Sequence, residues 1–248
     1  MKFLIYVLIG FIAQMVDGTL GMAYGVTCRT FFKATTGLPS SVVSAVVHVA
    51  ELPTTLVSGI SHFKLKNLLP HLILPLIISG VIGGVTGAYF ITNIGSFLEP
   101  IIEVYLIIMG FKILFSAFKK EGKNRKIGKG VYLLGAVGGF LDATGGGGWG
   151  PVVSTTLIGL NEDEAKKSIG TVNIAELFVT LAETTTFVAL IGNFVSYTEI
   201  VLGIILGGVI AAPVAAVACK KLPIKKLLIC VGLLIITINF YELYMFIE

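Results

Sequence analysis

The stretch Asp17-Gly18-Thr19-Leu20-Gly21-Met22-Ala23-Tyr24-Gly25 has a near copy later in the chain. The second copy is Asp142-Ala143-Thr144-Gly145-Gly146-Gly147-Gly148-Trp149-Gly150. The two copies stand 125 residues apart, and each interrupts a long apolar segment. The same offset relates Ala50-Glu51-Leu52 to Ala175-Glu176-Leu177. Apolar segments that are duplicated and broken by glycines at matching places are typical of membrane transporters built from two repeats.

The composition is that of a multi-pass membrane protein. Of the 248 residues, 55% are hydrophobic and 13% are charged, and the mean hydropathy is +0.95. A soluble domain carries about a quarter charged residues. We therefore expect the lipid bilayer of the cell membrane as its environment. We expect no nucleic-acid partner, because the net charge of +4 lies mostly in short loops.

Eight apolar blocks follow one another, which predicts an all-α polytopic fold. They span roughly 3–32, 41–60, 68–92, 97–118, 130–158, 165–191, 198–218 and 224–246. A basic linker, 119–129, separates a first repeat, 1–118, from a second, 130–248, with four segments each. Six blocks have the length of one bilayer crossing, about 20 residues. The first and fifth have about 30 residues with central glycines, so we expect broken or re-entrant segments that meet at mid-membrane.

The distribution of basic residues predicts that the two repeats are inverted relative to each other. If the first and fifth blocks are re-entrant and the 119–129 linker is cytoplasmic, the other lysine clusters also face the cytoplasm. These lysines are Lys64, Lys66, Lys166, Lys167, Lys220, Lys221, Lys225 and Lys226. Each repeat then crosses the membrane three times, and this odd number inverts the second repeat. Arg29 and Lys33 are exceptions, because they fall on the outer side.

The glycine-rich copies form the predicted anion site. After each break a helix resumes, and its first backbone N–H groups have no partner within that helix. Two such N-termini direct N–H donors and positive dipole ends to one place, which suits an anion without requiring a lysine. The substrate-binding candidates are Gly18, Thr19, Gly21, Tyr24 and Gly25, together with Thr144, Gly145, Gly146, Gly147, Gly148, Trp149 and Gly150. The alternative is that the glycines only permit close helix packing.

Asp17 and Asp142, which begin the two copies, have two interpretations. As N-caps, their carboxylates accept a backbone N–H from the following half-helix. As coupling residues, they take up a proton, or a sodium ion held together with carbonyl oxygens of the break. The second interpretation arises because an ionisable group at membrane depth is costly and usually functional.

Polar side chains form a stripe on the second and on the sixth block, at spacings of three or four residues. The stripes consist of Ser44, His48, Glu51, Thr55 and Ser58, and of Asn173, Glu176, Thr180 and Glu183. We assign His48 and Asn173 to substrate binding. Glu51 and Glu176 are coupling candidates, because a carboxylate that is costly to ionise can carry a proton. The alternative is interhelical hydrogen bonding.

The sequence lacks the motifs of catalysis and of metal binding. It contains no His-Glu-x-x-His, no Gly-x-Ser-x-Gly and no cysteine pair at ligand spacing. His48 and Glu51 have a metal-like spacing, but Asn173 replaces the histidine in the second repeat. We therefore expect no enzymatic activity, no metal site and no cofactor.

Together these motifs resemble the sulfite exporter TauE/SafE family, also called toluene sulfonate uptake permeases. The resemblance rests on the paired Asp-x-Thr-x-Gly-x-x-x-Gly breaks, on Ala-Glu-Leu and on Gly-Gly-Val at 83–85 and 207–209, and it covers essentially the whole chain. It implies an inner-membrane transporter of small anions such as sulfite, thiosulfate, sulfoacetate and some organic acids. The first copy departs from the second, because Met22-Ala23 replaces two glycines. This departure points to weaker binding or to a coupling role in that copy.

We therefore expect a secondary active transporter that moves a small anion by alternating access, coupled to H⁺ or Na⁺. A cation transporter whose ligands are Asp17, Glu51, Asp142 and Glu176 is the main alternative, and an anion channel is the other. The sequence leaves the anion, the direction of flux, the coupling ion and the oligomeric state open, with a homodimer as one option.

Overall fold

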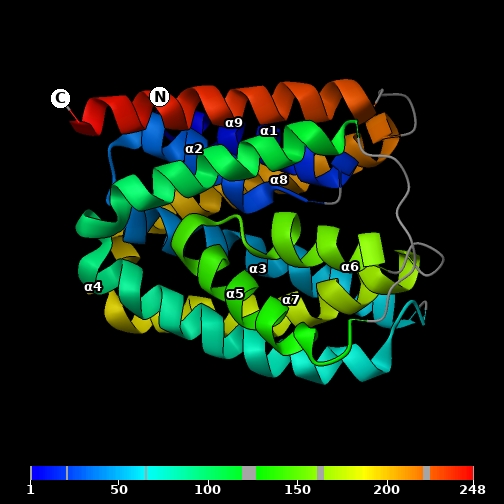
Figure 1. The fold of residues 1–248 in the computed structure, drawn as a ribbon. Coiled ribbons are helices and arrows are strands. Elements are labelled where there is room, and N and C mark those ends of the chain that lie inside the picture. The colour runs from blue at the N-terminus through cyan, green and yellow to red at the C-terminus, as the bar shows by residue number, and fades with distance from the viewer. Residues whose placement is uncertain are drawn as a thin grey trace.

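The computed structural model describes residues 2–20, 22–64, 66–118, 127–160, 165–219 and 224–247. These residues are almost entirely helical and include no β-strand, as the hydropathy pattern predicts. Most of the helices run along one common direction and form a bundle (Figure 1). Gly21 and residues 119–126 of the predicted linker lie outside the described part.

Six of the eight apolar blocks form helices close to the predicted bounds. The second, sixth, seventh and eighth are α3 (Ser40–Lys64), α7 (Ala165–Leu190), α8 (Thr198–Cys219) and α9 (Ile224–Ile247). The third and fourth are the two arms of α4 (Pro70–Ser116), which bends at Ile94, where φ is −128° and ψ is 22°. The 3₁₀-helix η3 (Phe194–Tyr197) connects α7 to α8.

Large apolar side chains cover much of the outer surface. Leu74, Ile82 and Phe240 are each more than 60% exposed, at 63%, 61% and 63%. Such exposure would be unusual on a soluble protein but matches contact with lipid tails. Within the described part of the chain, four stretches are long and apolar enough to cross a membrane, namely Pro70–Gly95, Lys167–Leu190, Phe194–Ala212 and Leu228–Phe246.

The first and fifth blocks are interrupted where the glycine-rich copies predict. The first divides into α1 (Lys2–Leu20) and α2 (Tyr24–Thr36), and Ala23 before α2 has a left-handed φ of 81°. The fifth divides into α5 (Gly130–Gly145), the π-helix η1 (Trp149–Ser154) and α6 (Thr155–Leu160). α5 ends at Gly146, whose φ of 64° suits a residue without Cβ.

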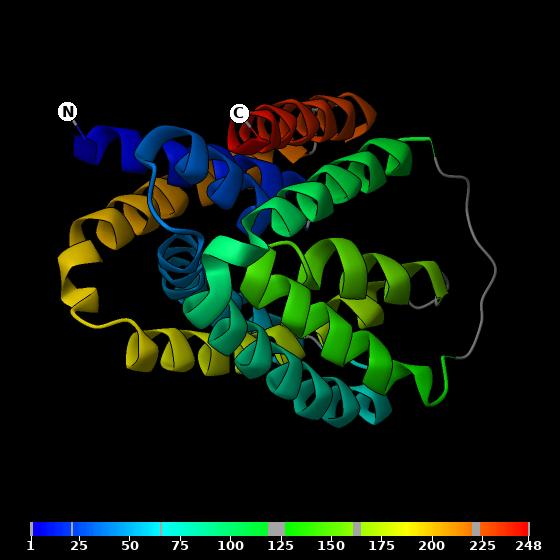
Figure 2. The ribbon, with the colours of Figure 1, turned by 60° about the vertical axis from the view of Figure 1, so that its left-hand side comes forward.

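Each interrupted block turns back on itself as a hairpin (Figure 2). Lys2 at the start of α1 and Thr36 at the end of α2 line the same surface pocket. Val131 near the start of α5 and Leu157 in α6 pack in the same core cluster.

The two hairpins enter the bundle from opposite ends. Near the base of the first hairpin, Tyr6 belongs to the same apolar cluster as Tyr197, which follows α7. The base of the second hairpin packs on Leu69. Leu69 in turn lies next to Thr171, near the start of α7, because the backbone N–H of Leu69 donates to the Thr171 hydroxyl at 2.7 Å.

Each hairpin also packs on a helix of the other half of the chain. α1 lies along α8, and α5 lies along the first arm of α4. Both contacts depend on glycines, because a methyl group at Gly207 would overlap the carbonyl oxygen of Val7, and one at Gly83 would overlap that of Ala136. α3 and α7, which carry the two polar stripes, pack against each other.

Candidate functional site

The two helix breaks touch each other inside the bundle. A methyl group at Gly25 would overlap the carbonyl oxygen of Gly146, and one at Gly147 would overlap the side chain of Val26. Gly150 lies against Met22 and Ala23. The close approach of these two backbones explains why both copies are rich in glycine.

A cavity of about 300 Å³ lies beside this contact. Its lining includes half of the predicted site residues, namely Asp17, Tyr24, Gly25, Glu51, Asp142, Gly146, Gly150, Asn173 and Glu176. The other lining residues are Gln14, Met22, Ala23, Thr54, Thr55, His62, Pro151, Ser154 and Ile169. Most of these were missed by the sequence analysis, although Met22 and Ala23 lie inside the first copy and Thr55 lies on the first stripe.

Four carboxylates dominate the charge of the cavity. They are Asp17 and Glu51 from the first half of the chain and Asp142 and Glu176 from the second. No lysine or arginine is among the described residues that line it. The backbones of both breaks and these four acids therefore share one small space.

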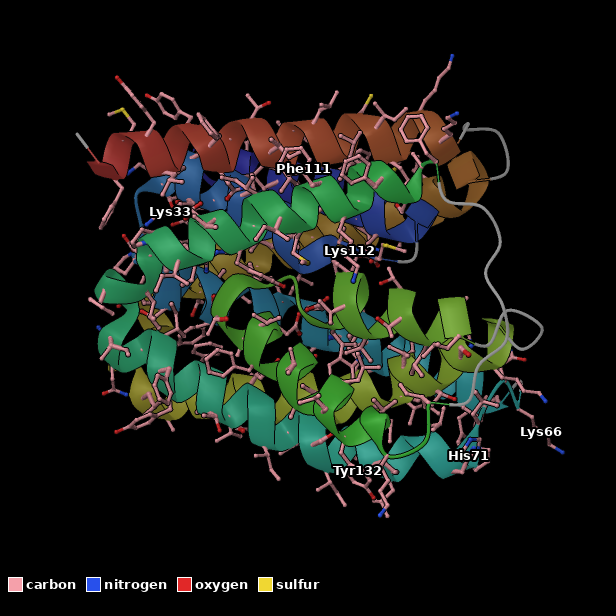
Figure 3. The ribbon with its side chains drawn as sticks, viewed as in Figure 1. Lys33, Lys66, His71, Phe111, Lys112 and Tyr132 are labelled. Carbon is pink, nitrogen blue, oxygen red and sulfur yellow. The ribbon has the colours of Figure 1, made fainter. Side chains whose placement is uncertain are left out.

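The cavity reaches the end of the bundle where α3 finishes and α7 begins. His62, close to the end of α3, and Ile169, which is 36% exposed, belong to its lining. Lys64 and Lys66 follow directly, and Lys66 lies at the opposite end of the bundle from Lys33 (Figure 3). The cavity thus opens toward the end that the lysine distribution places in the cytoplasm.

Asp142 caps the second half of its hairpin. Its Oδ1 accepts the backbone N–H of Gly148 at 3.1 Å and that of Trp149 at 3.0 Å. The backbone N–H of Tyr24, 125 residues before Trp149, lies near the Asp17 carboxylate. Asp142 thus accepts the first N–H groups of the second half-helix, although the N-cap position itself is Gly148, and the N–H groups of Gly148 and Trp149 are already paired within the protein.

Several residues of the second copy point away from the cavity. The Thr144 hydroxyl donates to the carbonyl of Phe140 at 2.8 Å, and the indole N–H of Trp149 donates to the carbonyl of Val172 at 3.2 Å. Gly145 lies against the ring of Tyr105, and Gly147 lies against the side chain of Val26. Gly148 packs against the backbone of α5 and likewise does not line the cavity.

Three residues of the first copy cannot be assigned to the cavity in the same way. Gly18 and Thr19 belong to the last turn of α1. The surroundings of the Thr19 side chain and the whole of Gly21 lie outside what the structure describes.

His48 lies behind the cavity wall, where it is 1% exposed, and it is not part of the lining. Its Nδ1 is 2.7 Å from the carbonyl oxygen of Ser44. Its Nε2 is 3.0 Å from Oε2 of Glu183 and 3.7 Å from Oδ2 of Asp142. Sequence spacing places Glu183 on the stripe of α7, but it does not reveal that Glu183 faces His48.

Arg29 and Lys33, the exceptions to the charge rule, are engaged inside the protein. Arg29 is 1% exposed, and its Nη1 donates to the Ser44 hydroxyl at 3.0 Å. Lys33 forms an ion pair of 2.9 Å with Glu99, beyond the bend of α4. Because Arg29 is buried and hydrogen-bonded to Ser44, and Lys33 is paired with Glu99, neither residue belongs to an exposed loop.

Known proteins resemble the chain over nearly its whole length. The profile of the family described as "Sulfite exporter TauE/SafE" matches residues 6–241. The "Probable membrane transporter protein YtnM" of Bacillus subtilis (strain 168) is 35% identical over 245 residues, covering 96% of this chain and 81% of that protein. No solved structure gives a significant match. Both matched regions include the two glycine-rich copies.

Proposed function

Because the chain belongs to the sulfite exporter TauE/SafE family of membrane transporters, we propose that it moves a small anion by secondary active transport. The substrate class is a sulfur oxyanion or sulfonate, such as sulfite, thiosulfate or sulfoacetate, or an organic acid. The observation that supports the proposal is the cavity at the contact of the two breaks, with polar groups from both halves of the chain.

The four acids of the cavity support coupling of the anion to a cation. Two like charges 4 Å apart repel by about 4 kcal/mol at an effective dielectric constant of 20. An anion therefore binds beside Asp17, Glu51, Asp142 and Glu176 only after these carboxylates are neutralised. Protons or sodium ions would supply that neutralisation, which couples their movement to that of the anion.

Two inverted repeats, 1–118 and 130–248, would give the cavity access to each side in turn. Two observations support this part of the proposal. The hairpins enter from opposite ends, and each packs on the third segment of the other half. The cavity reaches the end near His62, whereas Arg29 and Lys33, which make polar contacts toward the far end, do not line it. Rocking of one half against the other would exchange these two ends.

A flux assay in proteoliposomes tests the proposal. We expect the purified chain to accumulate ³⁵S-labelled sulfite when a proton or sodium gradient is imposed, and to do so faster than protein-free liposomes. A chain with both Glu51→Gln and Glu176→Gln should lose gradient-driven accumulation. Anion transport would be refuted if liposomes with and without protein accumulated sulfite equally under either gradient. The same equality would have to hold for thiosulfate and sulfoacetate.

A cation transporter is the second candidate, because four carboxylates without a described lysine or arginine form a plausible cation site. The same liposomes, loaded with a divalent-cation indicator, separate the two. Cation entry without any movement of labelled sulfite would favour this candidate.

A further inference from the structure

The cluster of His48, Asp142 and Glu183 connects three helices behind the cavity. The three residues come from α3, α5 and α7, and they are 1%, 6% and 0% exposed. One ligand-type atom from each lies within 4.8 Å of the other two. Two carboxylates and an imidazole are thus enclosed together in the interior.

With a neutral imidazole, the described residues leave the charge of this cluster unbalanced. Among the described residues, His48 is the only ion-pair partner of Asp142 and of Glu183. Neither oxygen of the fully buried Glu183 carboxylate makes a hydrogen bond within the described part of the chain. Buried carboxylates are costly unless they are paired or coordinate a metal. A neutral imidazole leaves two negative charges, which one divalent cation would cancel.

The orientation of His48 fits a metal ligand better than a hydrogen-bond donor. Nδ1 meets the Ser44 carbonyl at 2.7 Å, so Nδ1 carries a proton, and in the neutral imidazole Nε2 presents its lone pair to the two acids. Nε2 makes no hydrogen bond within the described residues, although Oε2 of Glu183 is only 3.0 Å away. A metal ion bound by that lone pair would lie beside both carboxylates.

The separations between these atoms also suit one ion. Ligand atoms about 2.1 Å from a tetrahedral ion are about 3.4 Å apart. The observed distances from Nε2, 3.0 Å to Glu183 and 3.7 Å to Asp142, lie on either side of that value. Gly84 leaves room for the carboxylate, because a methyl group there would touch Oε1 of Glu183. Oδ1 of Asp142 is meanwhile fixed by two backbone N–H groups, as metal-bound carboxylates usually are.

We propose that His48, Asp142 and Glu183 bind one divalent transition-metal ion of the Zn²⁺ or Mn²⁺ class. An imidazole ligand favours such an ion over Na⁺, Mg²⁺ or Ca²⁺. The ion joins α3 to α5 and α7 and neutralises Asp142, an acid that also lines the cavity. This inference does not rest on anion transport, because the ion is a resident of the cluster and not the cargo.

The number of ions per chain follows from the sequence. At the 125-residue offset, the counterparts of His48, Asp142 and Glu183 are Asn173, Asp17 and Ser58. An amide, a carboxylate and a hydroxyl form a much poorer site for a transition metal. The chain should therefore hold one ion and not two. The sequence analysis expected none, because it paired His48 with its neighbour Glu51.

Metal content tests the proposal without any transport assay. The chain, with its affinity tag removed, is stripped with a chelator in detergent, equilibrated with Zn²⁺ or Mn²⁺, desalted and analysed by mass spectrometry of the elements. We expect about one ion per chain in the parent and in the control Glu176→Gln, which changes a cavity acid outside the cluster. Glu183→Gln and His48→Ala should bind at least tenfold more weakly.

Two further measurements keep the test decisive if these variants fold poorly. Gly84→Ala retains all three ligands but presses on the Glu183 carboxylate, and it should weaken metal binding as well. Co²⁺ added to the parent should give the visible absorption of a site with four ligands. A parent that binds neither metal and shows no Co²⁺ band, or a folded Glu183→Gln chain that retains the parent's metal content, would overturn the proposal.

Discussion

At the residue scale, the two carboxylate oxygens of Asp142 make two different kinds of contact. Its Oδ1 caps the half-helix after the break, while its Oδ2 faces His48. An N-cap needs only an acceptor oxygen, whereas the cluster with His48 needs a charge. Substitutions that separate these two properties can therefore distinguish the structural function from the electrostatic one.

We predict that Asp142→Ala lowers stability more than Asp142→Asn does. The alanine leaves the N–H groups of Gly148 and Trp149 without an acceptor, which costs about 0.5–2 kcal/mol, whereas the asparagine oxygen can still accept them. Thermal unfolding in detergent, followed by tryptophan fluorescence or circular dichroism, measures the difference. Equal loss in the two variants would show that the cap contributes little.

At the same scale, local sequence pattern identified the acids but not their partners. The duplication singled out Asp17, Asp142, Glu51 and Glu176, and all four line one cavity. It did not reveal the contact of His48 with Glu183, because those residues lie 135 positions apart and no local periodicity relates them. Thr144 and Trp149 looked like ligands, but their polar groups pair with backbone carbonyls.

At the element scale, the contact between the two breaks depends on the absence of side chains. Gly25 is the clearest case, since a methyl group there would overlap the carbonyl oxygen of Gly146, which is backbone and cannot rotate away. We predict that Gly25→Ala separates the hairpins and abolishes transport. Gly192→Ala is the matched control, because nothing lies within 4 Å of a methyl group at that position. A Gly25→Ala chain with the parent's flux and thermal stability would contradict this prediction.

The equivalent crossings of the hairpins lead to a second element-scale prediction. Gly83→Ala and Gly207→Ala should destabilise the protein by similar amounts, about 1–3 kcal/mol as for other overpacked positions. Each inserts a methyl group against the backbone of the hairpin helix that it faces. Unfolding temperatures of the two single variants, measured side by side, provide the comparison. A large effect at only one of the two glycines would argue against equivalent repeats.

Helix positions were predictable from the sequence because they depend on local features. Runs of apolar residues fixed α3, α7, α8 and α9 to within a few residues, and the glycines fixed both breaks. The third and fourth blocks were expected as separate segments, and they form two helical arms that meet at the kink at Ile94. Which helix packs on which depends on contacts between distant segments, and hydropathy carries no such information.

At the scale of the whole molecule, the cavity brings together acids from both halves of the chain at a site open to one end. Anion binding beside them depends on their neutralisation, so transport should decline as pH rises and the acids lose protons. We predict that Glu51→Gln and Glu176→Gln, which cannot ionise, move this decline to higher pH more than they change affinity. Initial rates of sulfite flux across a pH series give the profile. Variants with the parent's pH profile would exclude these two residues as proton carriers.

Cysteine labelling tests most directly whether an anion binds in the cavity where the two breaks meet. Thr54, a half-buried residue of the lining, is replaced by cysteine. In the same chain Cys219 and Cys230 are replaced by alanine. The rate at which a small cationic thiol reagent labels the new cysteine is then measured. Sulfoacetate is the competing anion, because sulfite itself consumes thiol reagents, and Ser196→Cys, exposed in η3, is the control. We predict that sulfoacetate slows labelling of Thr54→Cys several-fold and leaves Ser196→Cys unchanged. Labelling of Thr54→Cys at one rate with and without sulfoacetate and organic acids would contradict an anion site in this cavity.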